Sequence, residues 1–314
     1  MNELIHHFIF ESARRAPDSQ ALVHGERRLD YAALADTVTR AAHGFLWLGL
    51  QRGDRVAVYL EKNVENVAAM FGAAAAGCVF VPVNPLLKPE QVAYILADCN
   101  VRVLVTSGER LRQLAEALPG CPDLHTIVAT GAAEHPAALG CAQVLRWDRV
   151  MTDASPARSH EAIDADMAAI LYTSGSTGKP KGVVLSHRNM VAGARSVAHS
   201  LGNTPDDRIL AVLPLSFDYG LSQLTTAFHA GATAVLINHL LPRDELNAVT
   251  AECITGLAAV PPLWIQLAAL PWPADCTLRY FTNSGGAMQR PTLEALMAAL
   301  PGAKPYLMYG LTEA

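Results

Sequence analysis

Short apolar runs rich in β-branched residues alternate with segments of helical spacing along almost the whole chain. Most of these runs are followed by a segment with apolar residues every three or four positions, as in 88–100 and 243–254. Continuously apolar strands separated by helices are typical of parallel sheets whose two faces are covered. The pattern therefore predicts an α/β fold with mostly parallel sheets flanked by helices. The predicted strands occupy 55–60, 78–83, 101–106, 125–130, 168–173, 208–214, 232–238, 255–260 and 278–283.

Three segments of the chain depart from this alternating pattern. Residues 66–85 are long enough and apolar enough to span a membrane, but their Ala and Gly content and the change to "CVFVPV" favour a helix followed by a strand, so no membrane span is predicted. Residues 1–18 have no basic lead-in and predict an amphipathic helix rather than a secretory signal. The pattern fades over 131–166, where we expect an exposed connection and a subdomain boundary.

Composition narrows the classes of function. The chain has 314 residues, 51% of them hydrophobic and 17% charged, as globular proteins do. Its net charge of −5 gives no general affinity for nucleic acid, which favours a small-molecule site. Its 6 cysteines lack CxxC or zinc-knuckle spacing and predict buried thiols in a reducing, cytoplasmic setting.

The stretch "YTSGSTGKPKG", residues 172–182, lies between two strand-like runs. Its glycines let backbone amides approach a ligand, its hydroxyls add donors, and its lysines suit phosphate. The Walker template fails, because Gly175 and Gly178 enclose only two residues and Pro180 prevents a helix from continuing. The stretch predicts a phosphate loop of another kind, with a buried strand on each side. A solvated Gly/Ser hairpin is the alternative.

This stretch resembles the core motif of the AMP-forming adenylating enzymes, which include acyl-CoA synthetases, peptide-synthetase adenylation domains and luciferases. Three further stretches match that family in order: "AAAAGCVFVPVNP" (73–85), "NSGGAM" (283–288) and "YGLTEA" (309–314). The resemblance covers essentially the whole chain. It implies that residues 1–314 are an incomplete adenylation domain, with the large N-terminal part of the fold. The β-barrel subdomain and the mobile C-terminal domain are expected to be absent, as in a fragment of a longer protein.

The resemblance implies that a carboxylic acid attacks the α-phosphate of ATP, pyrophosphate leaves, and the acyl group passes to coenzyme A or to the phosphopantetheine of a carrier protein. It assigns catalysis to Lys181, Thr312 and Glu313, and Mg²⁺ to Glu313 with Thr173. Tyr309 resembles the aromatic residue that stacks on adenine. Without the other motifs, Thr312 would simply cap a helix. The implied nucleotide-binding residues are Thr173, Ser174, Gly175, Ser176, Thr177, Gly178, Lys179, Gly285, Gly286, Ala287, Tyr309 and Gly310.

The acid is less well defined. The resemblance places Phe217, Asp218 and Gly286 on the substrate side, where amino-acid-adenylating relatives often carry Phe-Asp and the Asp pairs with the α-amino group. Asp218 is equally consistent with a helix cap. We interpret Trp264 as helix-packing core rather than as pocket lining, and His187 as the start of a helix to about Leu201.

Two other functions stay open. The chain is alternatively a truncated, noncatalytic nucleotide-binding protein, or a phosphotransferase with a divergent phosphate loop. The first is distinguished by whether the encoding reading frame continues past Ala314, and the second would release ADP instead of AMP.

Overall fold

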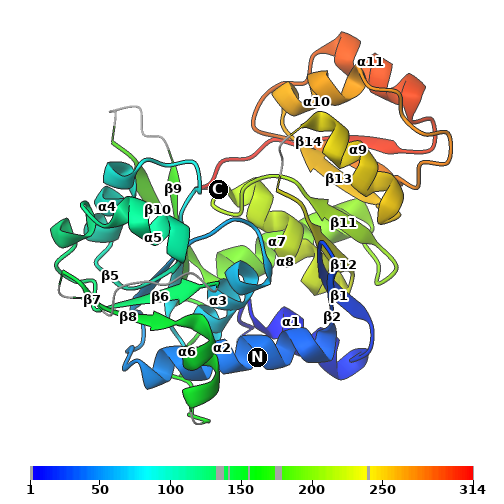
Figure 1. Cartoon of the computed structure of the whole chain (residues 1–314). Coiled ribbons are helices and arrows are strands. Elements are labelled where there is room, and N and C mark those ends of the chain that lie inside the picture. The colour runs from blue at the N-terminus through cyan, green and yellow to red at the C-terminus, as the bar shows by residue number, and fades with distance from the viewer. Residues whose placement is uncertain are drawn as a thin grey trace. The chain divides into compact units, whose positions relative to one another are not determined.

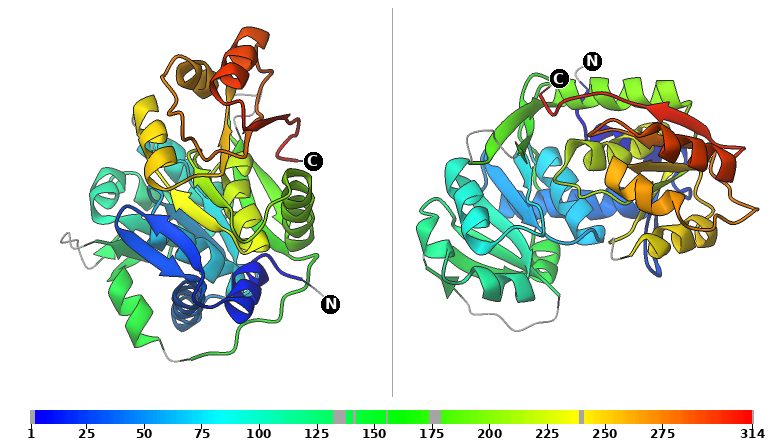
Figure 2. Two further views of the ribbon diagram at one scale, coloured as in Figure 1. Left: turned by 90° about the vertical axis from the view of Figure 1, so that its right-hand side faces the viewer. Right: turned by 90° about the horizontal axis from the view of Figure 1, so that it is seen from above.

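The computed structural model describes residues 3–131, 138–140, 142–154, 156–173, 179–238 and 241–313. The chain forms two compact units, which are drawn in Figures 1 and 2. Unit 1 contains residues 1–10 and 33–191, and unit 2 contains residues 11–32 and 192–314. Each unit has one mostly parallel sheet with helices on its faces.

The sheet of unit 1 has the strand order β10-β9-β4-β3-β5-β6-β8-β7. All neighbouring strands are parallel except the pairs β9–β10 and β7–β8. Its central strands are short runs of Val, Ile and Ala that are buried on both faces, as parallel sheets require. The strands are β3 (Arg55–Tyr59), β4 (Val79–Pro82), β5 (Val101–Ser107), β6 (Thr126–Thr130), β7 (Ala138–Leu139), β8 (Ala142–Arg146), β9 (Met167–Thr173) and β10 (Lys181–Ser186).

Helices cover both faces of this sheet. Helices α4 (Pro89–Asp98) and α5 (Gly108–Leu114), with the 3-10 turn η1 (Leu118–Gly120), form one hydrophobic core with alternate strand residues. The residues between them on the strands point to the other face, where α3 (Val64–Ala75) places Phe71 against Phe80 at 6.5 Å between ring centroids. Helices α2 (Tyr31–Trp47) and α6 (Trp147–Asp153) pack beside α3 on this face (Figure 1).

The sheet of unit 2 has the strand order β15-β14-β13-β11-β12-β1-β2, and only the hairpin β1–β2 is antiparallel. Helix α8 (Asp218–Ala230) lies against β11 and β12. Helices α9 (Pro242–Ala251), α10 (Pro261–Ala268) and α11 (Arg290–Ala299) form the core on the other face. The strands are β1 (Gln20–His24), β2 (Arg27–Asp30), β11 (Arg208–Ala211), β12 (Thr233–Leu236), β13 (Gly256–Ala259), β14 (Tyr280–Asn283) and β15 (Lys304–Leu307).

The predicted α/β fold is confirmed, and each of the nine predicted strands overlaps an observed strand. The N-terminal helix is present as α1 (His7–Arg15), and the apolar run 66–85 is α3 followed by β4. Among the described residues no helix is both long and apolar enough to cross a membrane.

The segment 131–166 differs from the expected exposed connection. Residues 142–153 form β8 and α6, and the side chains of Trp147 and Val150 are buried. The apolar pattern of β8 and α6 covers few residues and is surrounded by Ala, Gly and Pro. The sequence pattern therefore does not reveal these two elements. The chain passes between the two units at 10/11, 32/33 and 191/192.

Candidate functional site

The glycine loop of unit 1 connects two antiparallel strands. Thr173 at the end of β9 pairs with Lys181 at the start of β10, and Tyr172 pairs with Gly182. Because β9 runs parallel to β4, Thr173 lies at the carboxyl edge of the sheet, where ligands bind in open α/β folds. Ser174, Gly175, Ser176, Thr177 and Gly178 lie outside the described residues.

The prediction of a buried strand on each side of the loop is wrong for β10. The interior of β9 is buried, but β10 is the edge strand, and Val184 in its middle is 54% exposed. An edge strand has one neighbour and solvent beside it, so an apolar run there does not become core. The loop joins two antiparallel neighbouring strands and so closes a hairpin. This connection is compatible both with a phosphate loop and with a solvated Gly/Ser hairpin.

The two lysines of the loop have different surroundings. Lys181 is exposed at the first position of β10. Lys179 is also exposed, and its Nζ lies 5.7 Å from the ring centroid of Tyr94 in α4. The carbonyl of Pro180, between the two lysines, lies 3.4 Å from the Tyr94 hydroxyl. The segment around Lys179 therefore lies against α4.

In unit 2, the glycines of "NSGGAM" lie at the carboxyl edge of the sheet. Gly285 has φ +75°, and a Cβ there would lie 3.4 Å from Val260 Cγ1 and 3.6 Å from Phe217 Cζ. A Cβ on Gly286 would lie 3.2 Å from Pro261 Cγ. The backbone thus passes closely over the ends of neighbouring strands, and its glycines leave a flat, exposed surface.

Hydrogen bonds fix this turn to the adjacent strand ends. The side-chain Nδ2 of Asn283 donates to the Gly286 carbonyl at 2.8 Å. The carbonyl of Asn283 accepts from the Met308 amide, also at 2.8 Å. Asn283 is buried, and its Oδ1 has no hydrogen-bond partner among the residues that the structure describes. The turn at Gly285 and the segment after β15 therefore leave the sheet side by side.

The residues after β15 carry the remaining predicted groups of unit 2. Tyr309 is 92% exposed, and Gly310 and Glu313 are exposed as well, while Thr312 is half-buried. An aromatic side chain left so open has its ring face available to a ligand. Ala287 is exposed on the neighbouring turn.

The structure tests one of the two interpretations of Asp218, that of a helix cap. Phe217 occupies the N-cap position of α8 and makes no side-chain capping bond, and Asp218 is the first residue of the helix. The interpretation of Asp218 as the cap is therefore wrong, because a cap side chain must come from the residue before the first helical one. Its half-buried carboxylate lies in the first turn, where the helix dipole stabilises negative charge.

Three residues near this edge were missed by the sequence reasoning. The hydroxyl of Tyr219 hydrogen-bonds that of Thr282, and burial raises the pKa of Tyr219 above its ordinary value. Asn283 is the third. Their positions in the sequence could have indicated them. Tyr219 follows Asp218, and Thr282 and Asn283 end the strand before "SGGAM".

The predictions for Trp264 and His187 are confirmed. Trp264 is fully buried, and its Nε1 donates to the carbonyls of Ala259 and Thr282 at 3.0 Å each. His187 is the first residue of α7 (His187–Leu201) and accepts a bond from the Ile5 amide at 3.2 Å. Burial lowers the pKa of His187 to about 4. Both residues serve packing.

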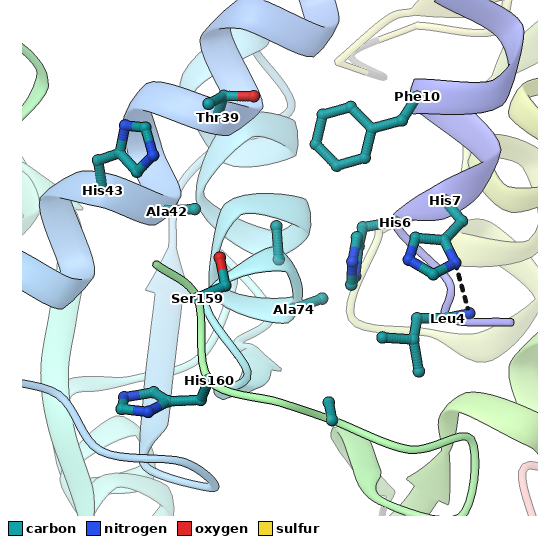
Figure 3. Close-up of a pocket in the computed structure, with 12 residues that line it drawn as sticks. Leu4, His6, His7, Phe10, Thr39, Ala42, His43, Ala74, Ser159 and His160 are labelled. Carbon is teal, nitrogen blue, oxygen red and sulfur yellow. Dashed lines mark hydrogen bonds between the residues drawn. The ribbon is translucent and has the colours of Figure 1, made fainter. Parts of the chain in front are cut away.

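A pocket of about 300 Å³ in unit 1 is separate from the predicted site residues (Figure 3). Four histidines contribute to its wall, and within the described part of the chain the Nδ1 atom of buried His6 has no hydrogen-bond partner. Burial lowers the pKa of His6 well below its ordinary value. The lining residues are Leu4, His6, His7, Phe10, Thr39, Ala42, His43, Ala74, Ala75, Ser159, His160 and Ala162.

ATP needs a flat surface for its purine, and Mg²⁺ needs oxygen ligands. The turn at Gly285 fits a flat purine, because Gly285 and Gly286 have no side chains to occupy the space above the backbone. In the described part of the chain no three His, Cys, Asp or Glu side chains gather closely enough to hold a metal ion alone. Mg²⁺ that is bound through phosphates needs only one or two protein oxygens, and Glu313 and Thr173 carry oxygens of that kind.

Comparisons with known proteins agree with these features. The family of AMP-binding enzymes matches residues 9–314. Phosphinothricin tripeptide synthetase PhsC of Streptomyces viridochromogenes is 32% identical over 313 residues, which cover 99% of this chain and 27% of that protein. 4-Coumarate–CoA ligase 3 of Arabidopsis thaliana is 29% identical over 329 residues, which cover 99% of this chain and 56% of that protein.

A solved structure of VinN with L-aspartate has 29% sequence identity and a TM-score of 0.84, and the match covers 99% of this chain and 77% of that one. The chain spans less than two thirds of the length of the curated relatives named above. The family match extends over nearly all of its residues. The chain therefore belongs to the family of AMP-binding enzymes.

Proposed function

We propose that the chain activates a carboxylic acid with ATP, forming an acyl-adenylate and releasing pyrophosphate, as part of an acid–thiol ligase. The observation that carries this proposal is that the turn at Gly285 and the segment with exposed Tyr309 leave adjacent strands side by side. Asn283 and Leu307 pair across β14 and β15, and Gly285 and Tyr309 each follow two residues later. A flat backbone and an aromatic face at adjacent strand ends suit the two faces of an adenine ring.

The phosphates are assigned to groups in both units. In unit 1, the hydroxyls and amides of residues 173–178 and the ammonium groups of Lys179 and Lys181 bind the triphosphate, with Lys181 nearest the pyrophosphate end. In unit 2, Thr312 contacts the α-phosphate and Glu313 holds Mg²⁺. The cation neutralises charge on the phosphates during transfer.

The acid is proposed to be amino-acid-like. Asp218 is not needed as a helix cap, so its carboxylate is available to pair with a substrate ammonium group. Phe217 and Gly286 lie on the same edge of the sheet and bound the acyl side. The similarity to a peptide synthetase and to a protein solved with L-aspartate supports this class.

The acyl-adenylate is proposed to react with a thiol and yield a thioester. The acceptor is coenzyme A or the phosphopantetheine of a carrier protein. The similarity to a CoA ligase supports the first, and the similarity to peptide synthetases supports the second.

ATP–pyrophosphate exchange tests the proposal. The protein is assayed as its full reading frame encodes it, against panels of amino, aryl and fatty acids. We expect exchange that depends on an amino acid, and we expect Asp218→Asn to raise the KM of that acid more than the KM of ATP. Exchange with fatty or aryl acids alone would contradict the substrate class. Release of ADP would support a phosphotransferase, and unaltered ATP a noncatalytic protein.

A further inference from the structure

We propose that Asp98 and Tyr94 of α4 are positioning residues for the phosphate loop. They connect both ends of the β9–β10 hairpin to the helix and thereby determine where Lys179 and Lys181 lie. The inference rests on the proposed role of this loop in binding the triphosphate. It assigns a function to a group of side chains that are not themselves phosphate ligands.

The first connection is at the β9 end of the loop. The hydroxyl of Tyr172, one residue before Thr173, donates to Asp98 Oδ2 at 2.6 Å. A bond this short to a carboxylate is of the stronger, charge-assisted kind. Burial, and then the bond to Asp98, raise the pKa of Tyr172, so its hydroxyl keeps its proton and remains a donor.

Glycine on the opposite strand makes room for this connection. Gly182 pairs with Tyr172 across the hairpin. A Cβ on Gly182 would lie 2.8 Å from Ile170 Cγ2 and 3.1 Å from Tyr172 Cζ. The Tyr172 ring therefore occupies the space above Gly182, and a larger residue there would displace the ring from its place beside Asp98.

The second connection is at the β10 end. Tyr94 and Asp98 are four residues apart and lie on one face of α4. The Tyr94 hydroxyl lies 3.4 Å from Asp98 Oδ1 and 3.4 Å from the Pro180 carbonyl, so it can donate to either oxygen. The Lys179 ammonium group lies 5.7 Å from the centroid of the Tyr94 ring, within the range of a cation–π contact. Tyr94 thus supports the segment that carries both lysines.

The position of Asp98 argues for this role. It is the last residue of α4, where the negative end of the helix dipole disfavours a carboxylate. A negative charge near a phosphate loop also opposes anion binding. Neither helix stability nor phosphate affinity explains an aspartate at the end of α4. Its bonds to Tyr94 and Tyr172 do explain it, because they orient both tyrosines toward the hairpin.

Hydrogen exchange of the nucleotide-free protein and titration with ATP test the inference together. In Asp98→Ala we expect the amides of residues 172, 173, 179 and 181–185 to exchange about fivefold faster or more, with little change in the rest of the described chain. We expect ATP affinity to fall about tenfold, as loss of a charge-assisted bond allows. Asp98→Asn keeps an oxygen acceptor for Tyr172 and should recover most of both losses. Tyr94→Leu should lower ATP affinity more than Tyr94→Phe, which keeps the ring.

Matched controls are Tyr59→Phe, which removes a hydroxyl bonded to the Leu87 carbonyl, and Asp123→Asn, which alters a half-buried carboxylate paired with Arg102. Both should leave ATP affinity and loop exchange unchanged. Unchanged exchange in Asp98→Ala would overturn the inference, as would faster exchange with unchanged ATP affinity. Failure of the unaltered protein to bind ATP would instead contradict the proposed function.

Discussion

At the scale of single residues, small changes of position decide which chemistry is available. Asp218 lies one residue too late to cap α8, so capping does not account for its carboxylate. Gly285 has a positive φ and close neighbours, so a flat surface is left where a side chain would otherwise stand. Both residues could be predicted as site candidates from the sequence. The sequence does not separate a helix cap from a substrate contact at Asp218, because apolar spacing does not show a one-residue shift in the start of a helix.

Replacing Gly285 by alanine tests the adenine surface. The positive φ should cost about 1–2 kcal/mol of unfolding free energy, and the added Cβ would lie 3.4 Å from Val260 Cγ1. We expect weaker ATP binding in a titration of the variant. Gly302→Ala is the control, since a Cβ there meets nothing within 4 Å. Equal ATP affinity in the two variants would count against the assignment.

Two buried histidines predict loss of stability in mild acid. An unfolded imidazole titrates near 6.5, whereas the pKa of His187 is lowered to about 4, first by burial. His7 also lowers this pKa, and Asp166 and Asp164 raise it. Above pH 6.5 both states are neutral. Between pH 6.5 and 4 the unfolded chain binds protons that the folded chain does not, so stability falls by on the order of 3 kcal/mol.

Urea unfolding between pH 7.5 and 4.5 measures this loss. His6 adds to it, because its pKa is also lowered by burial. His187→Asn keeps an acceptor for the Ile5 amide and removes one titrating group, so its stability should depend less on pH. A variant with the same pH dependence as the original chain would show that His187 does not cause the loss.

At the scale of elements, the strongly apolar strands and the helices between them could be predicted, and the edges could not. β1 and β2 are short and carry polar or charged residues, and β8 lies in an Ala- and Gly-rich region. The sequence predicts a buried β10 because most of its residues are apolar. Burial of a strand, however, depends on its neighbours in the sheet, and these come from distant parts of the sequence. The phosphate loop could be proposed from the sequence because its residue types carry the chemistry directly, and its role stays a prediction.

Close helix packing in unit 1 gives a prediction at this scale. A Cβ on Gly72 of α3 would lie 2.6 Å from the Ala41 Cβ of α2. Gly72→Val should therefore lower the unfolding free energy by about 1–3 kcal/mol through overpacking. Gly193→Ala in α7 is the comparison, because its Cβ meets nothing within 4 Å and alanine favours a helix. Thermal unfolding should rank Gly193→Ala at or above the original chain, and the reverse order would contradict this account of the packing.

At the scale of the whole molecule, each of the two units supplies a different part of the predicted chemistry. Unit 1 carries the phosphate loop and its lysines, and unit 2 carries the glycine turn, Tyr309, Thr312 and Glu313. The match to the AMP-binding enzymes covers residues of both units. The central claim is that the oxygen of a carboxylic acid attacks the α-phosphate of ATP.

Transfer of oxygen label tests this claim most directly. The protein is incubated with ATP, Mg²⁺, a thiol acceptor and an acid whose carboxyl oxygens are ¹⁸O, and the nucleotide product is analysed by mass spectrometry. Attack on the α-phosphate predicts AMP that carries one ¹⁸O atom, with much less of it from Lys181→Ala. Unlabelled AMP, or ADP with the label in the transferred phosphate, would contradict the account.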